Sequence, residues 1–290
     1  MIQEPAFQVA VALVLGLLFG SFANVCIHRI PERKSIVWPG SACPACGAAI
    51  AWYDNIPVFS YIALGGRCRA CRAPIPRRYP LIEALAGLLF AALSVRDGLS
   101  VQWMADAWLA LSILILVPID IEHGILPDLV TLPGIALGLL FSLAGGMAGL
   151  NTALWGAVVG AMVPLGVRLL YMSYVRVRSA AGGGAVTDRR HLPGDESADT
   201  GDERREGMGL GDVKMLAMVG AFLGVGKVLL TMLLGSVIGS LYVVPLVLLG
   251  RQSMKSSVPF GPFLGLAALI SLFAGAEIID WYMNLVISWT

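Results

Sequence analysis

Two aspartates lie where long apolar runs meet polar loops: Asp120 in IDIEHGILPD and Asp212 in GMGLGDVK. An ionised aspartate at the centre of a membrane-spanning helix costs about 2.5 to 3.5 kcal/mol on insertion scales, and the cost falls toward the interface. Two carboxylates that are brought together cannot both ionise easily, so one holds a proton while the other activates water. The pair therefore predicts hydrolysis by the acid–base chemistry of aspartic proteases.

Local structure explains these acidic residues to different degrees. Asp120 is expected at the C-terminal end of its helix, where the macrodipole disfavours an anion, so helix capping does not account for it. Asp128 is interpreted as the N-cap of the following helix. Asp212 follows three glycines, and its motif alone leaves both a catalytic and a capping interpretation open. Lys214 is expected to meet a lipid headgroup or a nearby carboxylate.

Four of the five cysteines form the motifs CPAC and CRAC, at Cys43, Cys46, Cys68 and Cys71. Two such pairs suit tetrahedral ligation of a structural zinc ion, because four thiolates leave no open coordination position. Disulfides are the alternative, which a reducing cytoplasm disfavours. The arginines around these motifs could also bind nucleic acid. Membrane topology explains the same arginines, so we expect no nucleic-acid partner.

The elements that position these residues are predicted to be membrane-spanning helices. The chain has 290 residues, of which 57% are hydrophobic and only 13% are charged, which is typical of a polytopic membrane protein. We predict an all-α integral membrane protein with about eight transmembrane helices and a small zinc-ribbon-like loop domain. The apolar stretches lie near residues 6–27, 80–95, 103–119, 128–147, 151–175, 212–225, 227–249 and 262–288.

Charge predicts the orientation of these spans. The connection after the first span carries eight basic residues: Arg29, Arg33, Lys34, Arg67, Arg69, Arg72, Arg77 and Arg78. By the positive-inside rule this connection is cytoplasmic and the N-terminus is outside. Alternating the remaining spans then places Asp120 and Asp212 on the cytoplasmic side as well.

Three parts of the chain follow from this pattern. Residues 1–27 form the first span, residues 28–79 form a cytoplasmic tetracysteine loop, and residues 80–290 form a polytopic membrane domain. Within the last part, the glycine-rich and charged segment 178–206 is expected to be a disordered cytoplasmic linker.

The chain resembles the type IV prepilin peptidase family in several motifs that occur in the same order. These are GSFANVCIHRIP at 20–31, the paired cysteine motifs, NIPVFSYIALGGRC at 55–68, RRYPLIE at 77–83, IDIEHGILPD, GMGLGDVK and VPFGPFL at 258–264. The resemblance implies that Asp120 and Asp212 are the catalytic pair of a membrane aspartic peptidase. It further implies a multi-pass protein of the bacterial inner membrane that serves type IV pilus or type II secretion systems.

The resemblance also implies the substrates and a second activity. Prepilins or pseudopilins would be cleaved on the cytoplasmic face, after a glycine that ends a short basic leader. The new N-terminal residue would then be methylated with S-adenosylmethionine as the methyl donor. Glu83, in the RRYPLIE motif, is a candidate for the methyl-donor site; its alternative role is an ion pair with Arg77 or Arg78.

Three alternatives stay open from the residues alone. The chain could be a peptidase without methyltransferase activity. It could be a transporter in which the membrane carboxylates relay protons, although a relay needs a path to both faces and both aspartates are expected on one side. It could also be a zinc-ribbon scaffold without catalysis, which would tolerate loss of both aspartates but not of the cysteines.

Overall fold

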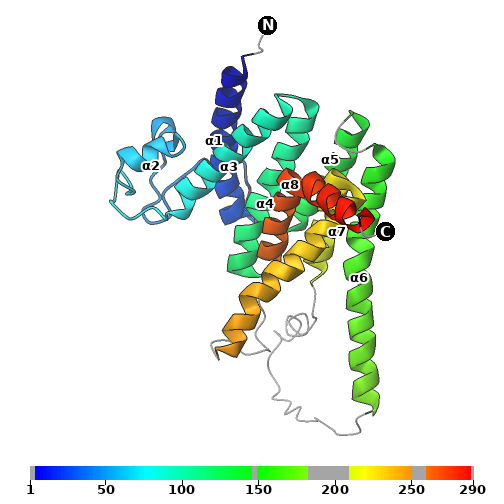
Figure 1. Cartoon of the computed structure of the whole chain (residues 1–290). Coiled ribbons are helices and arrows are strands. Elements are labelled where there is room, and N and C mark those ends of the chain that lie inside the picture. Colours follow the sequence, from blue (N-terminus) through cyan, green and yellow to red (C-terminus); the bar gives the residue numbers. More distant parts are fainter. Residues whose placement is uncertain (1–3, 146–148, 182–208, 250–258, 289–290) are drawn as a thin grey trace, which may run out of the picture.

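The computed structural model describes residues 4–145, 149–181, 209–249 and 259–288 (Figure 1). Within these residues the chain contains α-helices, one short 3₁₀ helix and two isolated β-bridges, but no β-strand. The all-α prediction is thereby confirmed. The elements are α1 (Pro5–Arg29), η1 (Trp52–Asn55), α2 (Phe59–Ala63), α3 (Arg78–Asp97), α4 (Val101–His123), α5 (Asp128–Leu143), α6 (Leu150–Ala181), α7 (Leu210–Leu248) and α8 (Gly261–Ile287).

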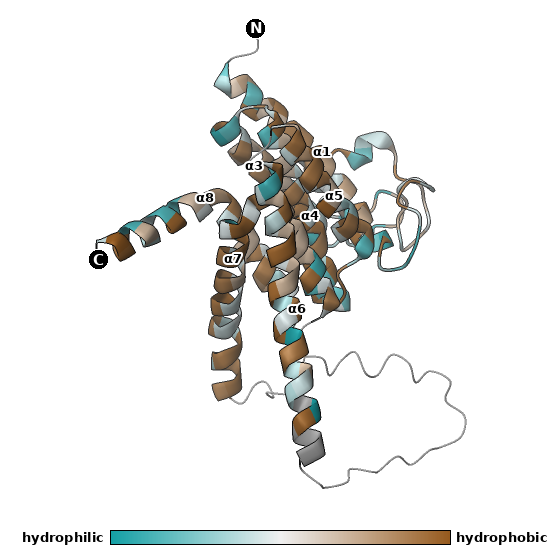
Figure 2. Cartoon of the chain, turned by 90° about the vertical axis from the view of Figure 1, so that its right-hand side faces the viewer, coloured by the Kyte–Doolittle hydropathy of each residue, from teal (hydrophilic) through white to brown (hydrophobic). Residues whose placement is uncertain are grey.

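Six of the described helices are long and apolar enough to cross a membrane: α1, α3, α4, α6, α7 and α8; α5 is a shorter apolar helix. Large apolar side chains cover their outer surfaces, as expected for helices in contact with lipid; Leu241 is 71% exposed and Trp155 is 62% exposed. Figure 2 shows this apolar colouring on α7 and through the middle of the bundle. The sequence expectation of a multi-pass membrane protein is confirmed.

Helix α7 is broken at Gly224, whose backbone adopts φ 78° and ψ −179°. This positive φ is readily available only to glycine. The break divides α7 into a first arm, residues 210–223, and a second arm, residues 225–248. Counted with α5, these arms account for the eight apolar segments predicted, including the separate stretches at 212–225 and 227–249.

Helices α1 and α3 form an antiparallel pair with the tetracysteine loop at one end. A Cβ atom added to Gly20 of α1 would lie 2.7 Å from the Cα atom of Glu83, so the backbones meet closely there. At the other end of the pair, the Leu99 N–H donates to the side chain of Gln8 over 3.2 Å. The structure places the loop at residues 30–77, between the end of α1 and the start of α3.

The bundle therefore has two ends, which we call proximal and distal. The proximal end holds the tetracysteine loop and the starts of α5, α7 and α8; the distal end holds the α3–α4 turn and Gly224. Lys214, on the first arm of α7, pairs with Asp128 at the proximal end. On the second arm, Gly239 lies beside Phe260, the N-cap of α8. The first arm consequently leads away from the proximal end, and the second arm returns to it.

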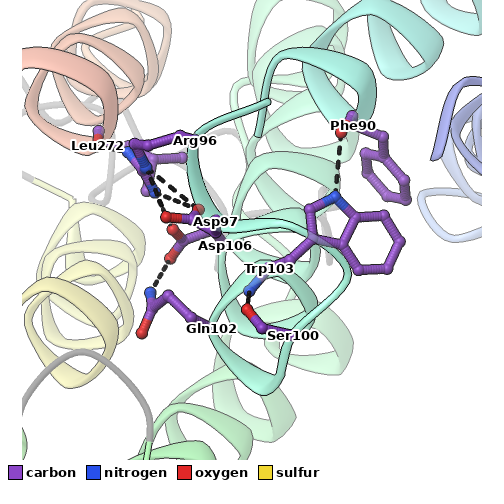
Figure 3. Close-up of polar contacts among 8 residues, drawn as sticks. All are labelled: Phe90, Arg96, Asp97, Ser100, Gln102, Trp103, Asp106 and Leu272. Atoms are coloured by element: carbon purple, nitrogen blue, oxygen red, sulfur yellow. Dashed lines mark hydrogen bonds and ion pairs between the residues drawn. The ribbon is translucent and has the colours of Figure 1, made fainter. Parts of the chain in front are cut away.

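A charged network around the buried Asp106 ties the helices together at the distal end (Figure 3). The Arg96 guanidinium donates to the Leu272 carbonyl of α8 over 2.7 Å and forms ion pairs with Asp97 and Asp106. Gln102 donates to the second oxygen of Asp106 over 2.9 Å. Asp106 is fully buried, so its charge depends on these partners. The sequence analysis did not single out this network.

The expected linker at 178–206 falls mostly on residues outside the described part of the chain. Its first four residues, 178–181, belong to the end of α6. The linker prediction is therefore wrong for these four residues and stays a prediction for the others.

Candidate active site and metal site

Asp120 lies near the C-terminal end of α4 and is buried, with 6% of its surface exposed. Its Oδ2 atom accepts a hydrogen bond from the Gly261 backbone N–H over 3.0 Å. Gly261 is the first residue of α8, so the carboxylate lies at the positive end of that helix. The dipole of α8 thus offsets the unfavourable position of Asp120 on α4.

The contact leaves no room for a side chain at residue 261. A Cβ atom added to Gly261 would lie 2.5 Å from Oδ2 of Asp120 and 2.9 Å from its Cγ atom. Pro262 follows in the first turn of α8, where a missing N–H removes no helical hydrogen bond. The Gly-Pro pair of VPFGPFL therefore lets α8 begin directly against the carboxylate.

Asp212 is the third residue of α7 and is also buried, with 8% exposure. Its carboxylate lies beside Gly209, the N-cap residue; a Cβ atom added there would lie 3.7 Å from Oδ2 of Asp212. Asp212 is therefore not the N-cap, and the N-cap interpretation of this residue is wrong. Gly209 has φ −68°, so it does not use the positive φ that glycine allows.

Close backbone packing brings the start of α7 toward the end of α4. A Cβ atom added to Gly211 would lie 2.9 Å from the Cβ atom of Leu126, in the turn between α4 and α5. Asp120 and Asp212 are close enough for their charges to interact. The structure thus brings the two predicted residues to the same end of the bundle: Asp120 is buried against the start of α8, and Asp212 is buried in the first turn of α7.

Two ion pairs lie beside these carboxylates. Lys214 Nζ is 2.6 Å from Asp128 Oδ1, and Arg78 pairs with Glu122. The N-cap of α5 is Pro127 rather than Asp128, so the N-cap prediction for Asp128 is wrong. Asp128 is instead the first residue of the helix, and its side chain pairs with Lys214. Of the two partners expected for Lys214, the structure therefore shows the nearby carboxylate.

The basic side chains nearby, Arg78 and Lys214, are therefore paired with Glu122 and Asp128 rather than with the buried aspartates. Among the residues that the structure describes, neither Asp120 nor Asp212 has a salt-bridge partner. Two buried carboxylates that lack a basic partner favour sharing a proton, because placing two negative charges in one low-dielectric site is costly. Such a site can hold one carboxyl as an acid and the other as a base.

The four motif cysteines form one cluster at the proximal end. Their Sγ atoms all lie within 4.8 Å of one another, and those of Cys43 and Cys71 are 3.9 Å apart. A tetrahedral zinc ion with bonds of about 2.3 Å would separate its sulfur ligands by about 3.8 Å. The cluster therefore fits a zinc ion in both its donor atoms and its spacing.

Both cysteine motifs have the same backbone fold. The N–H of Cys43 donates to the Ala48 carbonyl over 2.9 Å, and the N–H of Cys68 donates to the Ala73 carbonyl over 2.9 Å. Backbone N–H groups of Cys71 and Ala70 point at the Cys68 sulfur and lower the pKa of that thiol to about 7. Donors aimed at sulfur favour the thiolate form that binds metal.

Glu83 is buried near the proximal end of α3, and its Oε2 atom accepts a hydrogen bond from the Val58 N–H over 2.7 Å. Arg78 pairs with Glu122 instead, so the ion-pair alternative for Glu83 is wrong with respect to that arginine. Arg77 has no carboxylate partner within the described ranges. Glu83 therefore connects α3 to the N-cap of α2 in the tetracysteine loop.

Two family models match the chain. The model described as the bacterial peptidase A24 N-terminal domain matches residues 14–96. The model described as the type IV leader peptidase family matches residues 107–244, which include both buried aspartates.

Curated proteins named prepilin leader peptidase/N-methyltransferase are similar over nearly the full length. The protein of Stutzerimonas stutzeri is 35% identical, with 97% of this chain and 96% of the relative covered. That of Pseudomonas putida is 36% identical over 98% and 96%, and that of Aeromonas hydrophila is 34% identical over 97% and 95%. No solved structure shows a significant match to the chain.

Proposed function

Because the chain belongs to the type IV leader peptidase family, we propose that it removes the leader peptides of type IV prepilins and pseudopilins and methylates the new N-terminus. Both activities appear in the names of relatives that match over nearly the whole chain. The observation that carries the peptidase assignment is the pair of buried carboxylates, Asp120 and Asp212, within the segment that the family model covers.

In this proposal Asp120 and Asp212 share one proton and activate one water molecule. The ionised carboxylate accepts a proton from the water as its oxygen attacks the scissile carbonyl carbon, and the protonated carboxyl donates to the carbonyl oxygen. The tetrahedral intermediate then breaks at the C–N bond, and a proton passes to the leaving amine. The Gly261 N–H holds Oδ2 of Asp120, which leaves Oδ1 for water or substrate.

The placement of the site suits a substrate that is itself anchored in the membrane. Both aspartates lie at the end of the bundle that carries the basic tetracysteine loop, which the positive-inside rule assigns to the cytoplasm. The leader would approach from the cytoplasm while the apolar segment of the prepilin stays in lipid, with cleavage after a glycine. In the same orientation the N-terminus lies outside. The position of both aspartates at one end offers no support for a proton relay across the membrane.

The chain would bind two groups, a zinc ion, for which the structure offers a cysteine cluster, and the methyl donor, which the names of the relatives imply. Zinc would be held by Cys43, Cys46, Cys68 and Cys71 and would stabilise the loop without entering the chemistry. S-adenosylmethionine would supply the methyl group. Glu83 remains a candidate residue for methylation; because Val58 engages its buried carboxylate, it would act by holding the loop in position.

Cleavage and methylation can be measured on one substrate in membranes. Purified prepilin is incubated with wild type, Asp120→Asn, Asp212→Asn and the matched control Asp128→Asn, and mass spectrometry reads the product. We expect wild type and the control to give a shortened pilin that carries one added methyl group. Full cleavage by either catalytic variant would contradict the aspartic mechanism, and an unmethylated product from wild type would indicate a peptidase alone.

A further inference from the structure

The tetracysteine loop exposes large aromatic and aliphatic side chains at three places. Trp38 is 78% exposed, Trp52 is 81% exposed and Phe59 is 69% exposed, with Val37 and Ile62 beside them at 82% and 70%. Soluble domains rarely leave several such side chains uncovered, and exposed apolar groups of this kind mark interaction surfaces. Tryptophan in particular is enriched where a protein meets the headgroup layer of a membrane.

The same loop is positively charged. Residues 30–77 contain six basic residues and two acidic ones. Both acidic residues are already paired: Glu32 with Lys34 at 2.5 Å, and Asp54 with Arg69 at 2.6 Å. The remaining arginines are exposed and have no carboxylate partner in the described ranges of the chain: Arg33, Arg67, Arg72 and Arg77. An anionic partner is therefore the one that fits this charge.

Both ends of the loop continue directly into membrane-spanning helices. Arg29, at the end of α1, donates to the carbonyls of Ser35 and Gly40 over 3.0 and 3.2 Å, which fixes the first part of the loop. The Val58–Glu83 hydrogen bond fixes the middle of the loop to α3. These attachments hold the loop close to the plane in which the helices leave the bilayer.

The loop projects to the side of the bundle rather than across its end. Figure 1 shows α2 and its surroundings beside α1 and α3, on the side away from α8. Because lipid surrounds the helices laterally, a domain that projects sideways at the membrane boundary lies over headgroups. RNA would also fit arginines and tryptophans, but the attachment and the sideways position favour the membrane.

We infer that the tetracysteine loop docks on the anionic lipid surface of its own membrane. Trp38, Trp52 and Phe59 enter the headgroup region, and the unpaired arginines meet the lipid phosphates. The two kinds of contact act together, because apolar insertion brings the arginines to the surface where the negative potential is greatest. The docked loop would hold its zinc site beside the proximal end, at a fixed height relative to Asp120 and Asp212.

Tryptophan quenching in lipid nanodiscs tests this docking on the full-length protein. The discs contain phosphatidylcholine alone or an equal mixture with phosphatidylglycerol, and their lipids are brominated near the headgroup. Wild type is compared with the double variant Trp38→Ser/Trp52→Ser. The difference in quenching between the two proteins then reports on these two of the seven tryptophans. We expect this difference in quenching to be at least about threefold larger in the anionic discs. A zero difference in both lipids, or an equal difference in both, would overturn the proposal.

Two further variants separate docking from folding and from membrane depth. Trp155 is exposed on α6, and Trp155→Phe should lose the same quenching in both lipids because this residue faces the bilayer. The double variant Arg33→Gln/Arg77→Gln should weaken docking by about fivefold per arginine. Quenching of Trp38 and Trp52 in the anionic discs should then fall to its level in the neutral discs. Each variant must retain one zinc ion per chain. If an RNA oligonucleotide quenches Trp38 and Trp52 and the brominated lipid does not, the lipid assignment is wrong.

Discussion

The Oδ2 atom of Asp120 lies 3.0 Å from the backbone nitrogen of Gly261, which joins the end of α4 to the start of α8 across 141 residues of sequence. The donor in this contact is a backbone N–H, so its position is fixed by the start of α8 rather than by a side-chain rotamer. It also requires a glycine, because a Cβ atom would lie 2.5 Å from the same oxygen. The geometry of Asp120 therefore depends on residue 261 as much as on α4.

We predict that Gly261→Ala lowers prepilin cleavage by about 100-fold, since a displacement of about 1 Å in a catalytic group has an effect of that size. Cleavage rates in membranes, with protein amount normalised, would measure it. Gly166→Ala is the matched control, because a Cβ atom at that helical position meets no atom within 4 Å. Equal activity of the two variants would show that the Gly261 contact does not position the acid.

The distal network predicts a large loss of stability when one partner is removed. Arg96→Gln leaves fully buried Asp106 without its guanidinium but with the Gln102 donor, and we expect unfolding to become easier by about 1 to 3 kcal/mol. Adding Asp106→Asn should recover part of this loss, because the uncompensated charge is then gone. Thermal unfolding in detergent would compare wild type, both single variants and the double variant. Additive losses would contradict direct coupling.

The two cysteine motifs carry different residues at one shared left-handed backbone position, which suggests a stabilising substitution. Gly47 in the first motif has φ 71°, and Arg72 at the equivalent position of the second has φ 60°. A left-handed conformation costs a residue with a Cβ atom about 1 to 2 kcal/mol. Arg72→Gly should therefore make the loop more resistant to proteolysis, whereas Gly47→Ala should make it less resistant. The opposite order would contradict the equivalence of the two motifs.

Loss of zinc should affect the loop more than the bundle. Cys43→Ser removes one of four clustered ligands, and we expect the bound zinc to fall from one ion per chain to nearly none. Proteolysis within residues 30–77 should then accelerate while the helices stay protected by their packing. Zinc analysis and mapping of the cleavage sites would check this. Wild-type zinc content in Cys26→Ser, which alters the cysteine outside the cluster, serves as the control.

Much of this arrangement could be predicted from periodic and local features of the sequence. The apolar runs at 212–225 and 227–249 indicated two segments, and the backbone does break between two helical arms at Gly224. The four cysteines were identified from their spacing. Asp120 was recognised as unfavourable on its own helix, and its compensating partner could not be seen because Gly261 is distant in sequence.

Pairing between distant helices accounts for the residues that were missed or misinterpreted. Asp128 has the sequence features of an N-cap, but the helix begins with Asp128 itself, and its side chain pairs with Lys214. Arg96 has no distinguishing local motif, and its partners on α4 and α8 are visible only once these helices pack against the end of α3. The local sequence around a residue does not reveal such partners, because they depend on which helices pack together.

The most direct test is the kinetics of single and double substitutions at the catalytic pair. If Asp120 and Asp212 act as one unit, Asp120→Asn and Asp212→Asn should each reduce cleavage by about 1,000-fold or more, and the double variant should be no slower than either single variant. Zinc content and thermal stability should stay near those of wild type. Substantial cleavage by either single variant, or losses that multiply in the double variant, would contradict a shared aspartic dyad.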